Sequence, residues 1–380
     1  MNQRSGPLVG LKVIELGAIG PVPFAAGYFG DLGADVLRIE SPNPGLDLPS
    51  RDTSPHLRSR ACATLNLRNA DDLAVCAELI NKADVLLEGF RPGTLERLGL
   101  DPRDLCQRNP GLIVGRMTGW GQTGPMADRA GHDINYIAMS GPLAHAARAG
   151  QAPVPPINLL GDFGGGAMFL ITGVLSALYE RSQSGQGQVI DAAMVDGAAY
   201  LMMLIYSFRS EGMWRTESGT NLLDTGAPFY DVYETADHKY LAVGCLEPKF
   251  YAAFIAGLGL DPAKLPPQHD VTRWPELRAL FAATIAGKTR DEWDDIFGET
   301  DACATGIRDL VEAATSEHLA QRETFLGSDS AQTDDIPLQP APAPRFSRTP
   351  GQARPRRDFR QGEHALQAWG IDRSSGSETA

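Results

Sequence analysis

Residues 11–40, LKVIELGAIGPVPFAAGYFGDLGADVLRIE, contain the pattern that decides the fold. The short apolar run Val13–Leu16 predicts a buried strand, and Phe24–Leu32 predicts a helix that ends at Gly33. Asp35–Ile39 then predicts a second strand, which completes a βαβ unit of ordinary length. The turn between strand and helix lacks the third glycine of a dinucleotide-binding loop and contains two prolines, so such a loop is not expected.

The same alternation of strands and helices continues downstream. Residues 63–69 and 84–90 predict strands, with an amphipathic helix over 70–83 between them and another helix opened by Pro92. Residues 111–125 predict a strand that runs into a glycine-rich loop. This alternation predicts an α/β fold with a large, doubly wound, Rossmann-like parallel sheet, in which ligands bind at the carboxyl ends of the strands.

A change of period near residue 229 indicates a second domain. Residues 229–246 alternate with period two about a turn at 236–239, which predicts a hairpin and a smaller α+β domain. The expected organisation is a large domain over 1–193, a linker over 194–228, a small domain over 229–327, and a partly disordered linker and C-terminal segment over 328–380 that returns to the large domain.

Composition restricts the classes of partner. The 380 residues have a formal net charge of −13, which disfavours nucleic acid and anionic membranes as partners. The content of hydrophobic residues, 43%, is ordinary for a globular protein. We expect no apolar run long enough to span a bilayer and no signal peptide. Five scattered cysteines, none in a C-x-x-C pair, argue against a disulfide framework or a zinc site and favour a reducing cytoplasm.

The segment AGHDINYIAMSGPLA, residues 130–144, places an imidazole at the mouth of a predicted buried helix. Asp133 and Asn135 are residue types that cap the first turn of a helix. His132 is different, because histidine is the residue type best suited to acid and base catalysis near neutral pH.

The segment NLLGDFGGGAMFL, residues 158–170, places Asp162 before three glycines at the start of a long apolar helix. An N-cap role would explain Asp162 alone. The glycines at 164–166 each weaken a helix, which indicates a close approach to the backbone. Bare amides at such a helix start would stabilise a developing oxyanion.

Glu247 lies at the junction between a predicted strand that ends at Leu246 and a predicted helix that begins at Pro248. The helix dipole alone is sufficient to favour an acidic residue there. A carboxylate that faced His132 would instead fix the tautomer and orientation of the imidazole.

Arginines close three successive predicted strands at Arg38, Arg68 and Arg91, and Arg97 follows two turns later. Each arginine alone is best explained as a solvated surface ion. Together, on an acidic protein, they are about equally consistent with a site for phosphate groups, with which arginine forms bidentate contacts.

With these residues identified, a resemblance is apparent in five ordered blocks and extends from about Gly10 to about Gly327. The chain resembles the family III CoA-transferase superfamily (CaiB-BaiF), and within it the racemases that epimerise the 2-position of 2-methylacyl-CoA thioesters. The resemblance implies a large doubly wound domain, a small domain and an interlocked homodimer. The blocks are AGHDINYIAMSGPLA, NLLGDFGGGAMFL, EGFRPGTLERLGL, GWGQTGP and GQGQVIDAAMVDG.

The resemblance also implies the roles of individual residues. His132 and Asp162 match the acid/base pair that transfers the proton through an enolate, Glu247 matches the partner of the histidine, and Asp133 belongs to the same catalytic set. No metal or redox cofactor is implied, and coenzyme A is part of the substrate. The residues that fall where the family holds coenzyme A or its thioester are Arg38, Leu67, Arg68, Gly89, Phe90, Arg91, Thr94, Arg97 and Tyr136.

Three alternatives compete with a racemase. A family III CoA-transferase would use Asp162 as a nucleophile and form a covalent anhydride, chemistry that needs no histidine. A CoA-binding module without catalysis would keep the arginines but have no reason to keep His132, Asp162 and Glu247 together. A serine hydrolase is weaker still, since no G-x-S-x-G motif is present.

Overall fold

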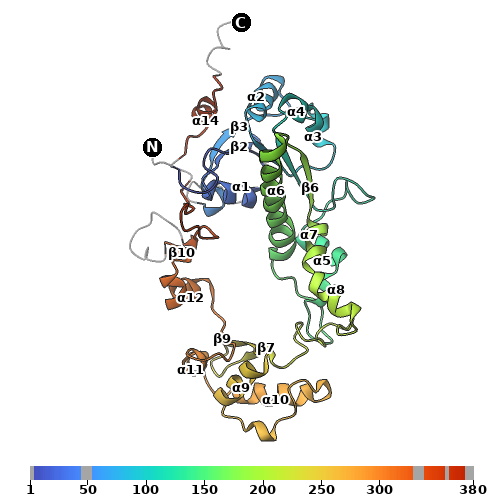
Figure 1. Cartoon of the computed structure of the whole chain (residues 1–380), viewed down its shortest axis with the longest axis vertical. Helices are drawn as coiled ribbons and strands as arrows, with labels where there is room; N and C mark the ends of the chain where they lie inside the picture. The colour runs from blue at the N-terminus through green and yellow to red at the C-terminus, as the bar shows by residue number, and fades with distance from the viewer. Residues whose placement is uncertain (1–3, 44–53, 328–337, 356–358, 373–380) are drawn as a thin grey trace. The chain divides into compact units, whose positions relative to one another are not determined.

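The computed structural model describes residues 4–43, 54–327, 338–355 and 359–372. The chain divides into two compact units (Figure 1). Unit 1 comprises Met1–Ser140, Ile157–Leu201 and Ala314–Ala380, and unit 2 comprises Gly141–Pro156 and Met202–Ala313.

Unit 1 is built on a six-stranded sheet in the order β3-β2-β1-β4-β5-β6, and every neighbouring pair is parallel. The predicted α/β class with a parallel sheet is therefore confirmed. The order reverses between β1 and β4, which is the switch point where doubly wound sheets leave a crevice for a ligand. The strands are β1 (Lys12–Leu16), β2 (Asp35–Glu40), β3 (Ala61–Thr64), β4 (Val85–Glu88), β5 (Ile113–Thr118) and β6 (Val189–Ala193).

Helices cover both faces of this sheet (Figure 1). Successive side chains of β1 point to opposite faces, so Ile14 belongs to one buried cluster and Val13 to the other. One cluster includes residues of α2, α4 and α14, and the other includes residues of α1 and α6. These helices are α1 (Pro21–Asp31), α2 (Ala70–Asn81), α4 (Pro102–Arg108), α6 (Met168–Ser184) and α14 (Glu363–Ala368).

Within the described residues, one helical run, Leu159–Ser184, is long and apolar enough to cross a membrane by length and composition, with a mean hydropathy of 1.5. The expectation that no such run exists was wrong. Leu170, Ile171 and Val174 of this run are buried in the core of unit 1. A core helix of a soluble protein passes the same test, so the run does not identify a membrane span.

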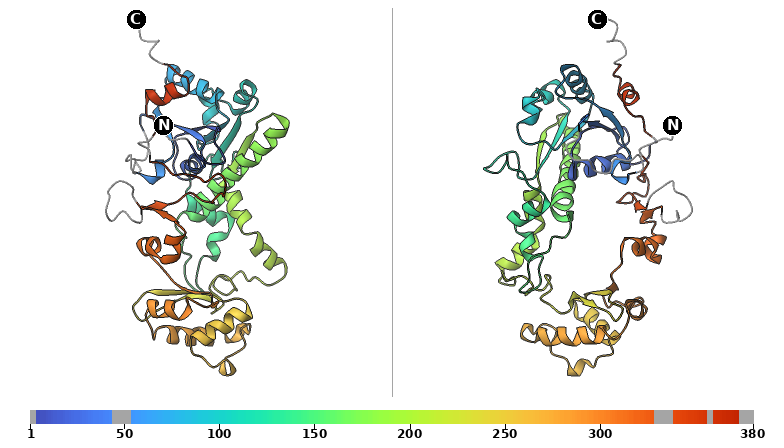
Figure 2. Two further views of the ribbon diagram at one scale, coloured as in Figure 1. Left: turned by 60° about the vertical axis from the view of Figure 1, so that its left-hand side comes forward. Right: turned by 180° about the vertical axis from the view of Figure 1, so that it is seen from behind.

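Unit 2 contains a three-stranded antiparallel sheet in the order β7-β8-β9, in which the predicted hairpin forms the first pair (Figure 2). Phe229, Phe254, Phe281 and Trp293 are buried in its core. The elements are β7 (Tyr230–Glu234), β8 (Tyr240–Gly244), β9 (Ala304–Gly306), α9 (Pro248–Gly257), α10 (Trp274–Ile285) and α11 (Arg290–Phe297).

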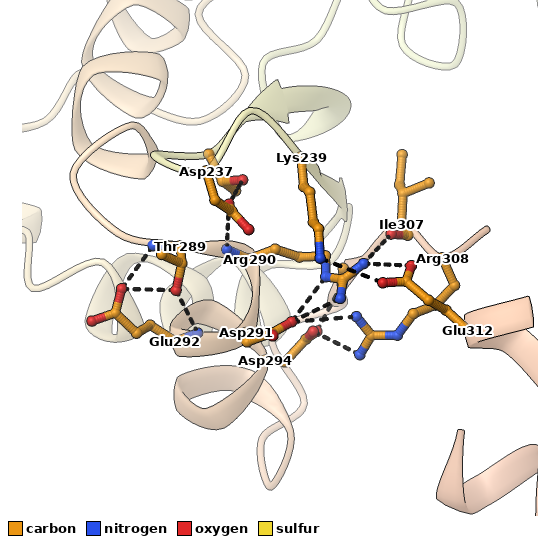
Figure 3. Close-up of polar contacts among 12 residues, drawn as sticks. Asp237, Lys239, Thr289, Arg290, Asp291, Glu292, Asp294, Ile307, Arg308 and Glu312 are labelled. Atoms are coloured by element: carbon orange, nitrogen blue, oxygen red, sulfur yellow. Dashed lines mark hydrogen bonds and ion pairs between the residues drawn. The ribbon is translucent and has the colours of Figure 1, made fainter. Parts of the chain in front are cut away.

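A polar network joins α11 to the chain that follows β9 (Figure 3). Arg290, which is 5% exposed, donates to Glu312 at 2.7 Å and to Asp291 at 2.8 Å. Arg308 donates to Asp294 at 2.7 Å. The carboxylates neutralise two guanidinium groups, so this end of unit 2 is held by charge as well as by its apolar core.

The two units differ from the predicted domain limits in three places, one of which is the end of unit 2 at Ala313 in place of residue 327. The predicted linker over 194–228 contains two helices, α7 (Met194–Leu201) and α8 (Met203–Ser210). Gly141–Pro156 groups with unit 2, and Arg148 of this segment pairs at 2.7 Å with the buried carboxylate of Asp231. A carboxylate with so little access to water needs such a partner.

The C-terminal segment groups with unit 1 from Ala314 onward. Its helix α14 packs against β3 in the core. The prediction that this segment is partly disordered falls on 328–337, 356–358 and 373–380, which lie outside the described residues.

Candidate active site

A cavity of about 690 Å³ opens in unit 1 at the carboxyl ends of the central strands. Its walls come from the loops that follow β1, β4 and β5, from helix α5 (Asp133–Ser140), and from the helical segment η3 (Leu159–Ala167). This is the place where a doubly wound sheet binds its ligand. His132 and Asp162 both line the cavity.

His132 lies directly before α5 and is exposed. Its backbone is used for capping: its N–H donates to Asn135 Oδ1 at 3.0 Å, and its carbonyl accepts the N–H of Asn135 at 2.8 Å. No described residue hydrogen-bonds its imidazole, which is therefore available to a ligand in the cavity.

Asp162 is not the N-cap of a helix, which is one role that the sequence allowed. It lies inside η3, a π-helical segment that runs directly into α6. Its carboxylate accepts a hydrogen bond from Asn158 Nδ2 at 2.9 Å. A Cβ at Gly20 would lie 3.3 Å from Asp162 Oδ2, so the loop after β1 passes close to this carboxylate.

The surroundings of Asp162 favour its protonated form. Burial raises the pKa of the half-buried carboxyl above its ordinary value, and the negative charge of Asp133 raises it further. The hydrogen bond from Asn158 and the neighbouring His132 act in the opposite direction. The net shift moves a carboxyl towards the range in which it can both accept and donate a proton.

The three glycines do not present bare amides to the cavity, and that expectation was wrong. Gly164–Gly166 lie within η3. Gly165 packs directly on α7, where a Cβ would lie 2.5 Å from the backbone nitrogen of Ala198. The close approach that the glycines indicated is therefore real, but it is to another helix and not to a ligand.

Asp133 is buried, with 4% of its surface exposed, and it is not one of the residues that line the cavity. Its Oδ2 atom accepts hydrogen bonds from the backbone N–H groups of Gly161 at 2.5 Å and of Asp162 at 2.8 Å. Asp133 thus joins the start of α5 to the segment that carries Asp162.

Tyr136, predicted to lie near the thioester, forms part of the cavity wall. Its ring packs against the backbone of Gly119 and Gly131, where a Cβ would lie 2.1 Å and 2.7 Å from the ring. Trp120 meets it edge-on at 4.8 Å between ring centroids. Burial raises the pKa of Tyr136 to about 12, so the phenol stays protonated at neutral pH.

Seven of the nine residues predicted to hold coenzyme A or its thioester fall into two groups. Gly89, Phe90 and Arg91 line the cavity directly after β4. Leu67 and Arg68 follow β3, and Thr94 and Arg97 lie in the short helix α3 (Thr94–Arg97), where Arg97 donates to Thr94 Oγ1 at 2.9 Å. None of these four residues lines the cavity itself.

Arg38 does not end its strand with a free guanidinium group. It lies within β2, bonds to the fully buried Glu15, and donates to Glu40 at 2.9 Å. Burial alone would lower the pKa of Arg38, but the two carboxylates raise it above its ordinary value. Arg38 therefore already compensates a buried charge, which the strand-end pattern did not predict.

His56 and Asn158 also line the cavity, and sequence reasoning missed both. Burial, followed by the charge of Arg60, lowers the pKa of His56, so the imidazole is neutral near pH 7. His56 belongs to no motif that would have singled it out. Asn158 lies four residues before Asp162, and on a helix this spacing could have predicted their hydrogen bond.

Glu247 lies in unit 2, at the N-cap of α9, and its side chain caps no backbone N–H. It is exposed. Since His132 belongs to unit 1, the pairing of Glu247 with His132 stays a prediction.

Comparisons with known proteins extend over nearly the whole chain. The sequence profile of CoA-transferase family III matches residues 8–365. The chain is 42% identical to the α-methylacyl-CoA racemase of Mus musculus over 95% of this chain and 92% of that protein. The α-methylacyl-CoA racemase of Homo sapiens is 40% identical over 96% of this chain and 94% of that protein.

Transferases of the same family are less similar. The succinyl-CoA–D-citramalate CoA-transferase of Chloroflexus aurantiacus is 32% identical over 91% of this chain and 89% of that protein. Among solved structures, a CaiB/BaiF family protein from Brucella suis matches with a TM-score of 0.79 at 23% identity and covers 97% of this chain and 99% of that one. That last likeness supports the fold.

Proposed function

The chain belongs to CoA-transferase family III, and from this premise we infer that it is a racemase of 2-methylacyl-CoA thioesters. The observation that carries the inference is that an imidazole, His132, and a carboxyl with a raised pKa, Asp162, line the same cavity. Two acid/base groups are what inversion of a carbon through proton transfer requires, one on each face.

The reaction is a 1,1-proton transfer. One group removes the α-proton, the electron pair of the C–H bond moves towards the thioester carbonyl as an enolate, and the other group returns a proton to the opposite face. When the substrate enters with the other configuration, the two groups exchange roles. The substrate is neither oxidised nor reduced, so the step needs no redox cofactor. We propose that no metal takes part either, because two acid/base groups are enough for the proton transfer.

The enolate oxygen needs hydrogen-bond donors, and the N–H groups of Gly161 and Asp162 in η3 already donate to Asp133. The first backbone N–H groups of α5 have no acceptor within their own helix. We propose that the start of α5, beside His132, stabilises the oxyanion instead.

We propose that coenzyme A binds along the loops after β3 and β4. Arg68, Arg91 and Arg97 are exposed there and can meet phosphate groups on a protein of net charge −13. The acyl group points to the cavity, where Ile19, Phe163 and Met194 provide apolar surface. These side chains suit an apolar branched chain and do not define it further.

The alternative is a CoA-transferase in which Asp162 attacks the thioester. A racemase is favoured because the racemases are 40–42% identical to this chain, against 32% for the transferase, and because His132 stands in the cavity wall where a transferase would have no use for it.

We propose that the enzyme acts as a homodimer in the cytoplasm, with no nucleic-acid or membrane partner. Large apolar side chains are exposed on unit 1, among them Met139 (63%), Leu159 (56%) and Tyr200 (61%). Exposed apolar surface of this kind favours a protein interface.

The test is incubation with a panel of (R)- and (S)-2-methylacyl-CoA esters in deuterated water, with α-proton exchange followed by NMR. A racemase incorporates deuterium and equilibrates the enantiomers. Acyl transfer to an added carboxylate without α-exchange would instead establish a transferase.

A further inference from the structure

The turn of η3 that carries Asp162 lacks a cap from its own sequence. Its N-cap residue, Asn158, makes no side-chain cap and donates its amide to Asp162 instead. The N–H groups that begin a helical segment need acceptors from elsewhere when they are buried. Gly161 is buried, and both its N–H and that of Asp162 donate to Asp133 Oδ2.

We propose that Asp133 is a positioning residue for Asp162: its carboxylate fixes the backbone of the turn that carries Asp162 and places a second negative charge beside the reacting carboxyl. The inference rests on the proposed racemase function and assigns to Asp133 an action through Asp162, without contact to the substrate.

The contact between Asp133 and η3 is tight enough to fix a position. A Cβ at Gly161 would lie 2.6 Å from Asp133 Oδ2 and 3.2 Å from Asp133 Cα. Only glycine leaves room for this approach. Two hydrogen bonds from successive amides to one oxygen define both the distance and the orientation of the Asp162 backbone.

The charge of Asp133 is not cancelled nearby. No described cation bonds to its carboxylate, and its Oδ1 atom is buried without a hydrogen-bond partner among the described residues. A carboxylate without a bonded cation acts electrostatically on a close neighbour, and Asp133 raises the pKa of Asp162 in this way.

Several groups around Asp162 can change the pKa of its carboxyl. The charges of Asp133 in α5 and of His132 directly before it act on Asp162. Asp162 in turn raises the pKa of the Tyr136 phenol, which Arg91 lowers. Asn158 contributes a neutral amide. The loop before α1 approaches with Gly20, and α7 packs on η3 with Gly197 and Ala198, which are uncharged. Asp133 is therefore the negative group in this set that opposes ionisation of Asp162.

The decisive variant is Asp133→Asn, which keeps an oxygen that can accept both N–H groups and removes the charge. Without that charge the pKa of Asp162 falls. When Asp162 acts as the base, on the (R)-substrate, the acid limb of the kcat–pH profile moves to lower pH. When it acts as the acid, on the (S)-substrate, the basic limb moves to lower pH. A purely structural role predicts unmoved limbs.

A second variant, Gly161→Ala, separates position from charge. The added methyl group pushes Asp133 away from η3 while every charge is kept. We expect kcat to fall by about 10²-fold, the cost of a displacement of roughly 1 Å at a reacting group, with KM for the acyl-CoA changed much less.

Asp261→Asn is the matched control, since Asp261 caps the N–H of Ala263 at 3.0 Å in unit 2. It should leave rate and pH profile unchanged, and thermal unfolding should show that all three variants are folded. Unmoved limbs in Asp133→Asn, or a wild-type kcat in Gly161→Ala, would overturn the inference. Absence of α-proton exchange in the wild-type enzyme would overturn the proposed function, a result that these variants cannot imitate.

Discussion

His132 and Asp162 stand in one cavity wall but differ in chemistry, so single substitutions should separate the two half-reactions. His132→Ala should lower net inversion by about 10²–10⁴-fold while the Asp162 carboxylate still exchanges the α-proton of the (R)-ester with deuterated solvent. Asp162→Asn should retain exchange of the (S)-ester only. NMR of each enantiomer in deuterated water measures both. Inversion retained at the wild-type rate in either variant would disprove the two-base mechanism.

Two arginines predicted to bind phosphate should behave differently. Arg91 is exposed in the cavity wall, so Arg91→Ala should raise KM for acyl-CoA by about 3–30-fold at low salt and weaken its dependence on salt. Arg38→Ala should above all lower the melting temperature, since it removes one of the two arginines bonded to the buried Glu15. An unchanged KM for Arg91→Ala at low ionic strength would refute the first expectation.

At the residue scale the sequence predicted which side chains reach the cavity better than it predicted their partners. His132, Asp162 and Arg91 were found because their types and neighbours form ordered motifs. The sequence did not predict the bonds of Asp133 to Gly161 and of Arg38 to Glu15, because each joins residues far apart in the chain. His56 enters the cavity through tertiary structure alone.

At the scale of elements, the alternation of strands and helices predicted the central strands of the sheet. Helix α4 and the segment η3 depend on local chemistry and packing that this alternation does not report. Helix α4 was missed, although Asp101 caps it and Pro102 begins it. The glycines of η3 were expected to leave backbone amides exposed at the start of a helix, because glycine is a poor helix former. Packing against α7 overrides that preference, since only glycines let the two backbones approach so closely.

This packing can be tested at Gly197 of α7. A Cβ there would lie 1.8 Å from the carbonyl oxygen of Gly165, so Gly197→Ala must push α7 away from η3. We expect a loss of about 1–3 kcal/mol in the free energy of unfolding, typical of overpacking, together with a lower kcat. Gly111→Ala is the control, because its Cβ would meet its nearest neighbours at an ordinary 3.8 Å. Equal stability of the two variants would contradict the close packing.

At the scale of the whole molecule, charge should make the stability of unit 2 depend on pH. The hydrogen bond from Arg290 lowers the pKa of Glu312 to about 2 (Figure 3). A carboxylate with a lowered folded-state pKa stabilises the fold above its ordinary pKa of about 4.3, and that contribution disappears as pH falls towards the folded value.

Glu312→Gln should therefore lower the melting temperature at pH 7, and the difference from wild type should shrink as pH falls below about 4. Thermal unfolding across this range measures the effect. Glu299→Gln, at an exposed position of unit 2, is the control and should change little at any pH. A difference that stays constant with pH would show that Glu312 acts through packing and not through charge.

The position of α14 has a consequence for the synthesis of the protein. Strand β3, at the edge of the central sheet, emerges early from the ribosome, whereas Leu366 and Trp369, which complete the core beside it, emerge near the end. Gly362 donates to the carbonyl of Cys62 at 2.8 Å, so the last-made segment also closes the open edge of the sheet. Until then an apolar face and a strand edge stay uncovered, a state that invites aggregation. A chain cut just before α14 would keep every residue of the cavity and leave this apolar face and strand edge uncovered for good.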